Sequence, residues 1–84
     1  MVTCEDFDKF VKEHFYLCAN KTDLQESTME LANYLGCERI MLYARFVTPQ
    51  LPGNRKIQVM LFSPSKYLSD GDEDDRYICR YVEY

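Results

Sequence analysis

The sequence contains little of what secreted and membrane proteins rely on. Its 84 residues include no tryptophan, one histidine, three glycines and three prolines. No apolar run approaches the ~20 residues that a membrane-spanning helix needs. The acidic start, MVTCEDFDKF, lacks the apolar segment of a signal peptide. These absences predict a cytoplasmic protein without a membrane segment, and the length leaves room for one domain, residues 1–84.

Patterns that carry catalysis or bind cofactors are also missing. The chain has no glycine-rich phosphate loop, no serine-centred elbow, no paired-carboxylate site and no C-x-x-C motif. His14 and Cys18 lie four residues apart and could share a zinc ion, but no second ligand pair accompanies them. A histidine at the boundary of the core is therefore the favoured interpretation. We predict a protein that is not an enzyme and holds neither a metal nor a cofactor.

The four cysteines are expected to be reduced thiols in or near the core, because disulfides are rare in the cytoplasm. The sequence alone leaves open whether any of them pair.

Charge is unevenly distributed along the chain. Residues 1–36 carry seven acids and three bases, residues 37–69 one acid and five bases, and residues 70–84 six acids and two bases. The formal net charge is -4. A basic middle between acidic ends argues against a protein that simply coats nucleic acid, although it permits a local phosphate contact.

The first 36 residues predict two antiparallel helices. Apolar residues recur at helical spacing over residues 4–18, and Thr3 with Asp6 forms the start signal of a capping box. For the second helix, Thr22 is the expected N-cap with Gln25 as its reciprocal partner. Gly36 is placed to end this helix in the left-handed conformation.

The second half predicts strands. Residues 56–62 alternate between apolar and more polar positions, as a strand with one buried face does. Residues 49–54 hold two prolines, a glycine and an asparagine, which indicate a loop. Residues 76–84 form a final strand rich in tyrosine, isoleucine and valine. The pattern does not decide which face of this last strand is buried.

The central stretch, residues 31–47, allows two architectures. If residues 39–47 form a strand, Ile40, Leu42, Ala44 and Phe46 face the helices, while Met41, Tyr43, Arg45 and Val47 face away. The fold is then α+β, with two N-terminal helices packed on one face of a three-stranded antiparallel meander. We take this as the main prediction.

The alternative makes residues 38–46 a third helix. The pattern L-A-x-x-L-G-C-x-R-x-x-L-Y-x-R-F, over residues 31–46, resembles helix-turn-helix segments. Arg45 departs from that pattern, since an apolar residue is usual there. With the later strands as a hairpin wing, the resemblance implies a winged helix that binds DNA through the helix beginning at Glu38. The acidic segment at the tip of that wing, residues 70–75, would repel phosphates.

Two clusters form the predicted binding surface. On the strand interpretation, an apolar and aromatic sheet face with basic groups among it faces outward, which suggests a binding surface. The acidic segment offers a negative patch to a basic partner. It alternates acids like a calcium loop, but the required glycine position is occupied by Asp75, which excludes an EF-hand. The residues expected to contact a partner are Met41, Tyr43, Arg45, Met60, Phe62, Asp70, Asp72, Glu73, Asp74 and Asp75.

The function predicted from these features is protein binding by docking. In size, acidity and lack of a catalytic motif the chain resembles the small inhibitors that phages encode against host nucleic-acid-handling machinery. That resemblance implies a nucleic-acid-binding protein as the partner. Direct nucleic-acid binding is the alternative, either as a winged helix or by stacking bases on Tyr43 and Phe62 with Arg45 alongside. A homodimer that covers the sheet face is also compatible with the sequence.

Overall fold

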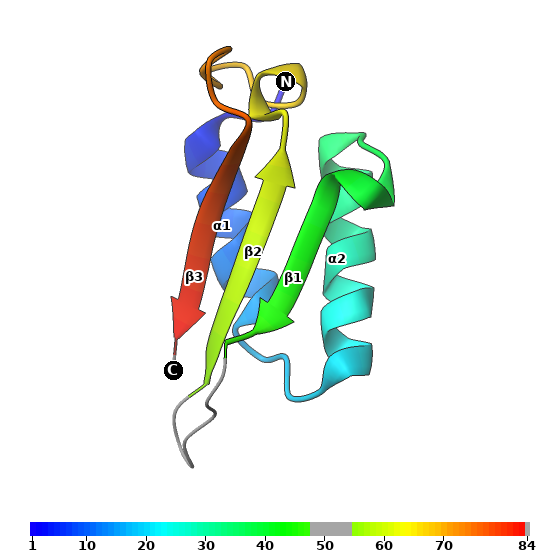
Figure 1. The fold of residues 1–84 in the computed structure, drawn as a ribbon. Coiled ribbons are helices and arrows are strands. Elements are labelled where there is room, and N and C mark those ends of the chain that lie inside the picture. Colours follow the sequence, from blue (N-terminus) through cyan, green and yellow to red (C-terminus); the bar gives the residue numbers. More distant parts are fainter. Residues whose placement is uncertain (48–54, 84) are drawn as a thin grey trace.

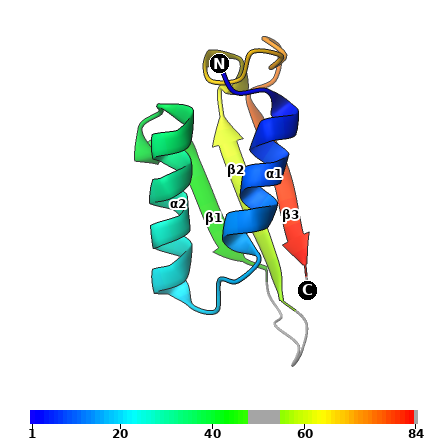
Figure 2. The same ribbon diagram turned by 180° about the vertical axis from the view of Figure 1, so that it is seen from behind.

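A computed structural model describes residues 1–47 and 55–83, and its fold is α+β. Helices α1 (Cys4–Phe15) and α2 (Lys21–Leu35) precede strands β1 (Leu42–Phe46), β2 (Lys56–Phe62) and β3 (Tyr77–Glu83). The strands form one antiparallel sheet in the order β1-β2-β3. Both helices lie on the same face of this sheet, with α1 behind β2 and β3 and α2 beside β1 (Figures 1 and 2). The main prediction of the architecture is confirmed.

The two helices begin at side-chain caps. Thr3 accepts the backbone N–H of Asp6, and the Asp6 carboxylate accepts the N–H of Thr3, which completes the predicted capping box. The predicted cap of α2 is wrong. Asn20, not Thr22, accepts the N–H of Asp23 at 2.9 Å, so the helix begins one residue after it. Asparagine is a stronger N-cap than threonine, and the Asp23 carboxylate adds a bond from the N–H of Ala19.

Gly36 ends α2 at φ 70°, as predicted, and the following residues differ from the expected strand. Arg39–Met41 form a single 3-10 turn, and the strand begins only at Leu42. Ile40, expected to face the helices, is 76% exposed. Met41, expected on the outward sheet face, lies in the 3-10 turn and packs against the core. The third helix of the winged-helix alternative is absent, because Leu42–Phe46 pair with β2.

The core lies between the helices and the inner sheet face. Phe7, Val11 and Phe15 of α1 meet α2 residues such as Leu31 and sheet residues such as Val59, all almost fully buried. The segment after β2 closes one end of this core. Its Leu68 is buried, forms a parallel bridge with Val2, and is followed by Ser69, whose N–H donates to the Val2 carbonyl. The N-terminus is therefore held against the segment that precedes β3.

The inner face of β3 contains one cation, which the sequence did not assign. Arg80 points toward α1 and donates to the Asp8 carboxylate at 2.6 Å. Ile78 and Val82 share that face, so Tyr77, Cys79 and Tyr81 lie on the outer one. This settles the face of the last strand, which was left open. Tyr84 and the loop predicted at 49–54 lie outside the described residues.

Candidate functional site

The outer face of the sheet is the most distinctive surface of the described chain. The registers β1–β2 and β2–β3 place side chains in rows across the three strands. One row holds Tyr43, Met60 and Cys79, and the next holds Arg45, Gln58 and Tyr81. Phe62 pairs with Tyr77 at one end, and Lys56 with Glu83 at the other. We call these ten side chains the outer face, and the members are Tyr43, Arg45, Lys56, Gln58, Met60, Phe62, Tyr77, Cys79, Tyr81 and Glu83.

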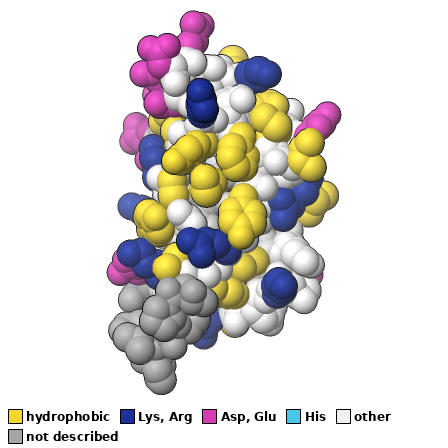
Figure 3. Space-filling view, in the orientation of Figure 1, with side chains coloured by type: hydrophobic (Ala, Val, Ile, Leu, Met, Phe, Trp, Pro, Cys, Tyr) yellow, Lys and Arg dark blue, Asp and Glu magenta, His cyan; other side chains and the backbone are white. Residues whose placement is uncertain are grey.

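Large aromatic groups on this face remain open to solvent. Tyr43, Tyr77 and Tyr81 are each about half exposed, at 49%, 52% and 51%. Phe62 lies edge-on to Tyr77, with ring centroids 6.3 Å apart. Figure 3 shows hydrophobic side chains gathered over the sheet and a cluster of acidic groups at one end of the molecule, with single acidic groups along its sides. The exposed face of an antiparallel sheet is ordinarily polar, so this composition is unusual.

Polar contacts connect the row of Arg45, Gln58 and Tyr81 on the outer face with its neighbours. Arg45 Nε donates to Gln58 Oε1 at 2.7 Å, and Gln58 Nε2 donates to the Tyr81 hydroxyl at 3.1 Å and to Cys79 Sγ at 3.2 Å. The Lys56 ammonium lies 4.8 Å from the centroid of the Tyr81 ring and 3.4 Å from the Glu83 carboxylate. The Tyr81 ring is thus held by its neighbours, which lowers the entropy lost when a partner covers it.

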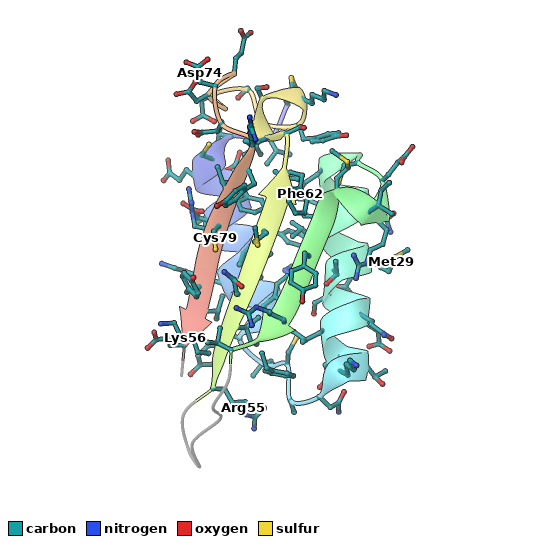
Figure 4. The ribbon with its side chains drawn as sticks, in the orientation of Figure 1. Met29, Arg55, Lys56, Phe62, Asp74 and Cys79 are labelled. Carbon is teal, nitrogen blue, oxygen red and sulfur yellow. The ribbon has the colours of Figure 1, made fainter. Side chains whose placement is uncertain are left out.

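The acidic segment lies beyond the end of β2 that carries Phe62, and Figure 4 shows Asp74 projecting there, at the opposite end from Arg55 and Lys56. Its members differ in their contacts. Asp70 accepts the N–H of Cys4 at 2.7 Å, in the first turn of α1. Asp72 accepts the N–H of Asp74 at 2.9 Å and stays exposed. Asp70 therefore has a structural role, while Asp72, Glu73, Asp74 and Asp75 present their charges to solvent.

The contact between Asp70 and Cys4 shifts both of their pKa values. The backbone N–H of Cys4 stabilises the carboxylate and lowers the pKa of Asp70. Burial raises the pKa of the Cys4 thiol, and the hydrogen bond with Asp70 raises this pKa further. The Cys4 thiol is therefore protonated at neutral pH, which makes it a poor nucleophile.

Asp70→Asn is expected to make the free energy of unfolding less dependent on pH in the acidic range. Because the folded state lowers the pKa of Asp70, the stabilisation is present above the ordinary aspartate pKa, near ~4, and is lost as pH falls through the lower folded value. Urea unfolding at pH 7 should therefore show the variant less stable than the parent, with the difference shrinking below pH ~4. Asp74→Asn is the control, and an equal loss in that variant would contradict the assignment.

A hollow lies beside the outer face, between α2 and β1. Its volume is about 610 Å³. Lys21 and Gln25 of α2 line one side, Arg39 of the 3-10 turn one end, and Tyr43 with Arg45 of β1 the other side. We call this the α2–β1 groove. Three cations and no carboxylate line it, although the protein as a whole is acidic.

His14 and Cys18, the pair considered for zinc, have other partners. His14 Nδ1 lies 3.0 Å from the Phe10 carbonyl, and its ring stacks on Phe10. The Cys18 thiol lies 3.3 Å from the Ser27 hydroxyl. Across residues 1–47 and 55–83, no three His, Cys, Asp or Glu side chains are placed to hold a metal ion. All four cysteines are free thiols.

The structure brings together part of the residue set predicted from sequence. Tyr43, Arg45, Met60 and Phe62 share the outer face, whereas Met41 lies in the 3-10 turn. The acidic segment is not part of the face but lies beyond its Phe62 end. Sequence reasoning missed Tyr77, Cys79 and Tyr81, which complete the face. Their signal was present as an alternation in 77–82, but both faces of that strand carry large side chains.

Comparison with protein-family models, curated proteins and solved structures finds no match for this chain. No helix in the described parts of the chain is long and apolar enough to cross a membrane.

Proposed function

We propose that this protein is a small cytoplasmic binding module that docks onto another protein through the outer face of its sheet. The observation that carries the proposal is the exposed aromatic cluster, Tyr43, Phe62, Tyr77 and Tyr81, on the outer face of the three-stranded sheet. Tyrosine and other aromatic residues are enriched where interfaces derive most of their binding energy. The action proposed is docking rather than catalysis.

The exposed acids support a role in steering. Asp72, Glu73, Asp74 and Asp75 are all exposed and lie at one end of the molecule, beyond Phe62 (Figure 4). Charges at the rim of an interface raise the association rate with an oppositely charged partner more than they raise affinity. The resemblance to phage-encoded inhibitors of nucleic-acid-handling proteins agrees with this, because such targets carry basic surfaces. A basic, nucleic-acid-binding protein is the partner proposed.

DNA binding as a winged helix has lost its basis, because residues 42–46 form β1 instead of a recognition helix. Stacking of single-stranded bases on Tyr43 and Phe62 remains chemically feasible on the outer face, and so does a second copy of the chain. Both are treated as competing outcomes of the experiment below.

The test uses a double variant of the outer face, Phe62→Ala with Tyr77→Ala. Immobilised protein is used to capture partners from host-cell lysate, and the captured protein is then purified and its affinity measured by surface plasmon resonance. We expect the double variant to bind at least ~10-fold more weakly, because each exposed aromatic anchor contributes ~1–2 kcal/mol. Met29→Ala is the matched control, since Met29 is 49% exposed on α2.

Three results would contradict the proposal. The first is equal binding by the double variant and the control. The second is a dimer in light scattering that the double variant dissociates, because the face would then be a homodimer interface. The third is binding of an oligothymidine that requires Phe62, because the occupant would then be a nucleic acid.

A further inference from the structure

The open edge of β1 carries main-chain groups that face the α2–β1 groove. The register pairs Phe46 with Ile57, and one step further Val47 donates its N–H to the Lys56 carbonyl at 2.8 Å. In an antiparallel ladder, bonded positions alternate along the strand. Arg45 and Tyr43 therefore bond with β2, while the N–H and C=O groups of Ala44 and Phe46 point away from it. Those groups face the groove, whose lining includes both residues.

The other edge strand of the sheet, β3, is partly blocked against pairing with a further strand. Arg80 Nη1 donates to the Cys79 carbonyl at 3.0 Å, so one acceptor of the β3 edge is already occupied. The same arginine points inward and pairs with Asp8. Inward-pointing charges on an edge strand are a common protection against pairing with another strand. On β1, Arg39 occupies only the carbonyl of Leu42, at the beginning of the strand.

The groove selects for negative charge. Arg39 and Arg45 donate to neutral oxygens, the Leu42 carbonyl at 2.9 Å and Gln58 Oε1 at 2.7 Å. Those bonds orient the two guanidinium groups without neutralising them. The ion pairs found among the described residues involve His14, Lys56 and Arg80 instead. Lys21 adds a third cation on α2.

We infer that the α2–β1 groove binds an extended acidic segment of a partner protein, which adds to the sheet as a fourth strand beside β1. A strand offers both donors and acceptors to the edge groups of Ala44 and Phe46, and alternate side chains can reach Arg39, Arg45 and Lys21. A nucleic acid satisfies the cations, but its phosphates accept and cannot donate to the edge carbonyls. This inference rests on the proposed docking function and specifies a second contact next to the outer face.

The experiment uses two ten-residue probe peptides, one alternating glutamate with valine and one alternating lysine with valine. Binding to the ¹⁵N-labelled full chain is followed by NMR, together with amide hydrogen exchange. We expect the acidic peptide to bind at least ~10-fold more tightly than the lysine peptide. At saturation it should slow exchange at the amides of Ala44 and Phe46, and leave those of Tyr43 and Arg45, already bonded to β2, unchanged.

Variants separate the edge from the charge. Ala44→Pro removes an outward N–H without removing a ladder bond, a position where an edge strand tolerates proline, and should abolish binding. Arg39→Glu with Arg45→Glu should weaken it at least ~10-fold. Lys66→Glu, an exposed cation away from the groove, is the matched control and should bind as the parent does. Circular dichroism confirms the fold of each variant, and the exchange pattern of the parent provides a test that needs no variant.

Equal binding of the two peptides, no binding of either, or binding that leaves Ala44 and Phe46 unprotected would overturn the inference. So would a ten-residue oligothymidine that protects the same amides. Any of these results, with partner affinity still reduced by the Phe62 and Tyr77 substitutions, would remove strand addition and leave the proposed docking function standing. Loss of the Phe62 and Tyr77 effect is the separate failure of the docking proposal itself.

Discussion

Phe15→Ala should lower the free energy of unfolding by ~3–5 kcal/mol, the usual cost of removing a fully buried aromatic ring. Phe15 is 0% exposed, at the end of α1, and belongs to the cluster that joins both helices to the inner sheet face. Neighbouring side chains cannot move in to fill the cavity that the ring leaves, because they are held on the helices and strands of the same core. Small domains have ~5–15 kcal/mol of stability in all, so this single change removes a large share of it.

Phe62→Ala is the matched control for this experiment, because it makes the same chemical change on the outer face. Phe62 is 36% exposed and contacts Tyr77 edge-on, so we expect its loss to cost less than ~1 kcal/mol. Urea unfolding of both variants, followed by circular dichroism, gives the two values. Similar losses in the two would mean that Phe62 is part of the core, and the outer face could not be a free binding surface.

The helices and the sheet could be predicted from the sequence because their signals are local and repeated. Apolar spacing placed α1 within a few residues, and Thr3, Asp6 and Gly36 marked helix ends whose geometry the structure reproduces. The start of α2 was misplaced because Asn20 and Thr22 are both acceptable caps. The choice between them depends on which carboxylate reaches back, and Asp23 does so to Ala19.

The stretch after Gly36 could not be resolved from periodicity. A strand through residues 39–47 would bury Ile40, but a single 3-10 turn shifts the phase and exposes it. Backbone bonds from Met41 N–H to the Glu38 carbonyl and from Leu42 N–H to the Arg39 carbonyl close that turn, and the Arg39 guanidinium donates to the Leu42 carbonyl as well. No pattern of hydrophobicity encodes these contacts. The same shift moves Met41 off the outer face and into contact with the core.

Only part of the candidate site could be predicted from the sequence, for a related reason. Tyr43, Met60 and Phe62 follow from alternation within single strands, whereas Tyr77 and Tyr81 require the register between β2 and β3. The sequence left the face of Arg80 open, because the carboxylate that pairs with it on the inner face, Asp8, is 72 residues away in sequence. Contacts of this range fix which face of the last strand is open, and hence the extent of the aromatic surface.

Gly71→Ala should destabilise the protein by ~1–3 kcal/mol, the range seen when a packed site is overfilled. A β-carbon at position 71 would lie 2.9 Å from the carbonyl carbon and oxygen of Pro64 and from the α-carbon of Ser65. These are backbone atoms, so no side-chain rotation can relieve the overlap. The N–H of Gly71 also donates to the Leu68 carbonyl, and Asp70 next to it holds the beginning of α1. A shift of the backbone here therefore disturbs the contact between the acidic segment and the N-terminus.

Gly36→Ala distinguishes this steric effect from simple loss of glycine's flexibility. Gly36 has φ 70°, and a β-carbon there would meet no atom within 4 Å. Its cost is the left-handed conformation alone, ~1–2 kcal/mol for a residue with a β-carbon. Hydrogen exchange separates the two: Gly71→Ala should speed exchange at Cys4, whose amide bonds to Asp70, and Gly36→Ala should leave that amide protected. If Gly71→Ala left both the stability and the Cys4 amide unchanged, the close approach of residues 64 and 71 would be refuted, and with it the packing that fixes the acidic segment at the start of α1.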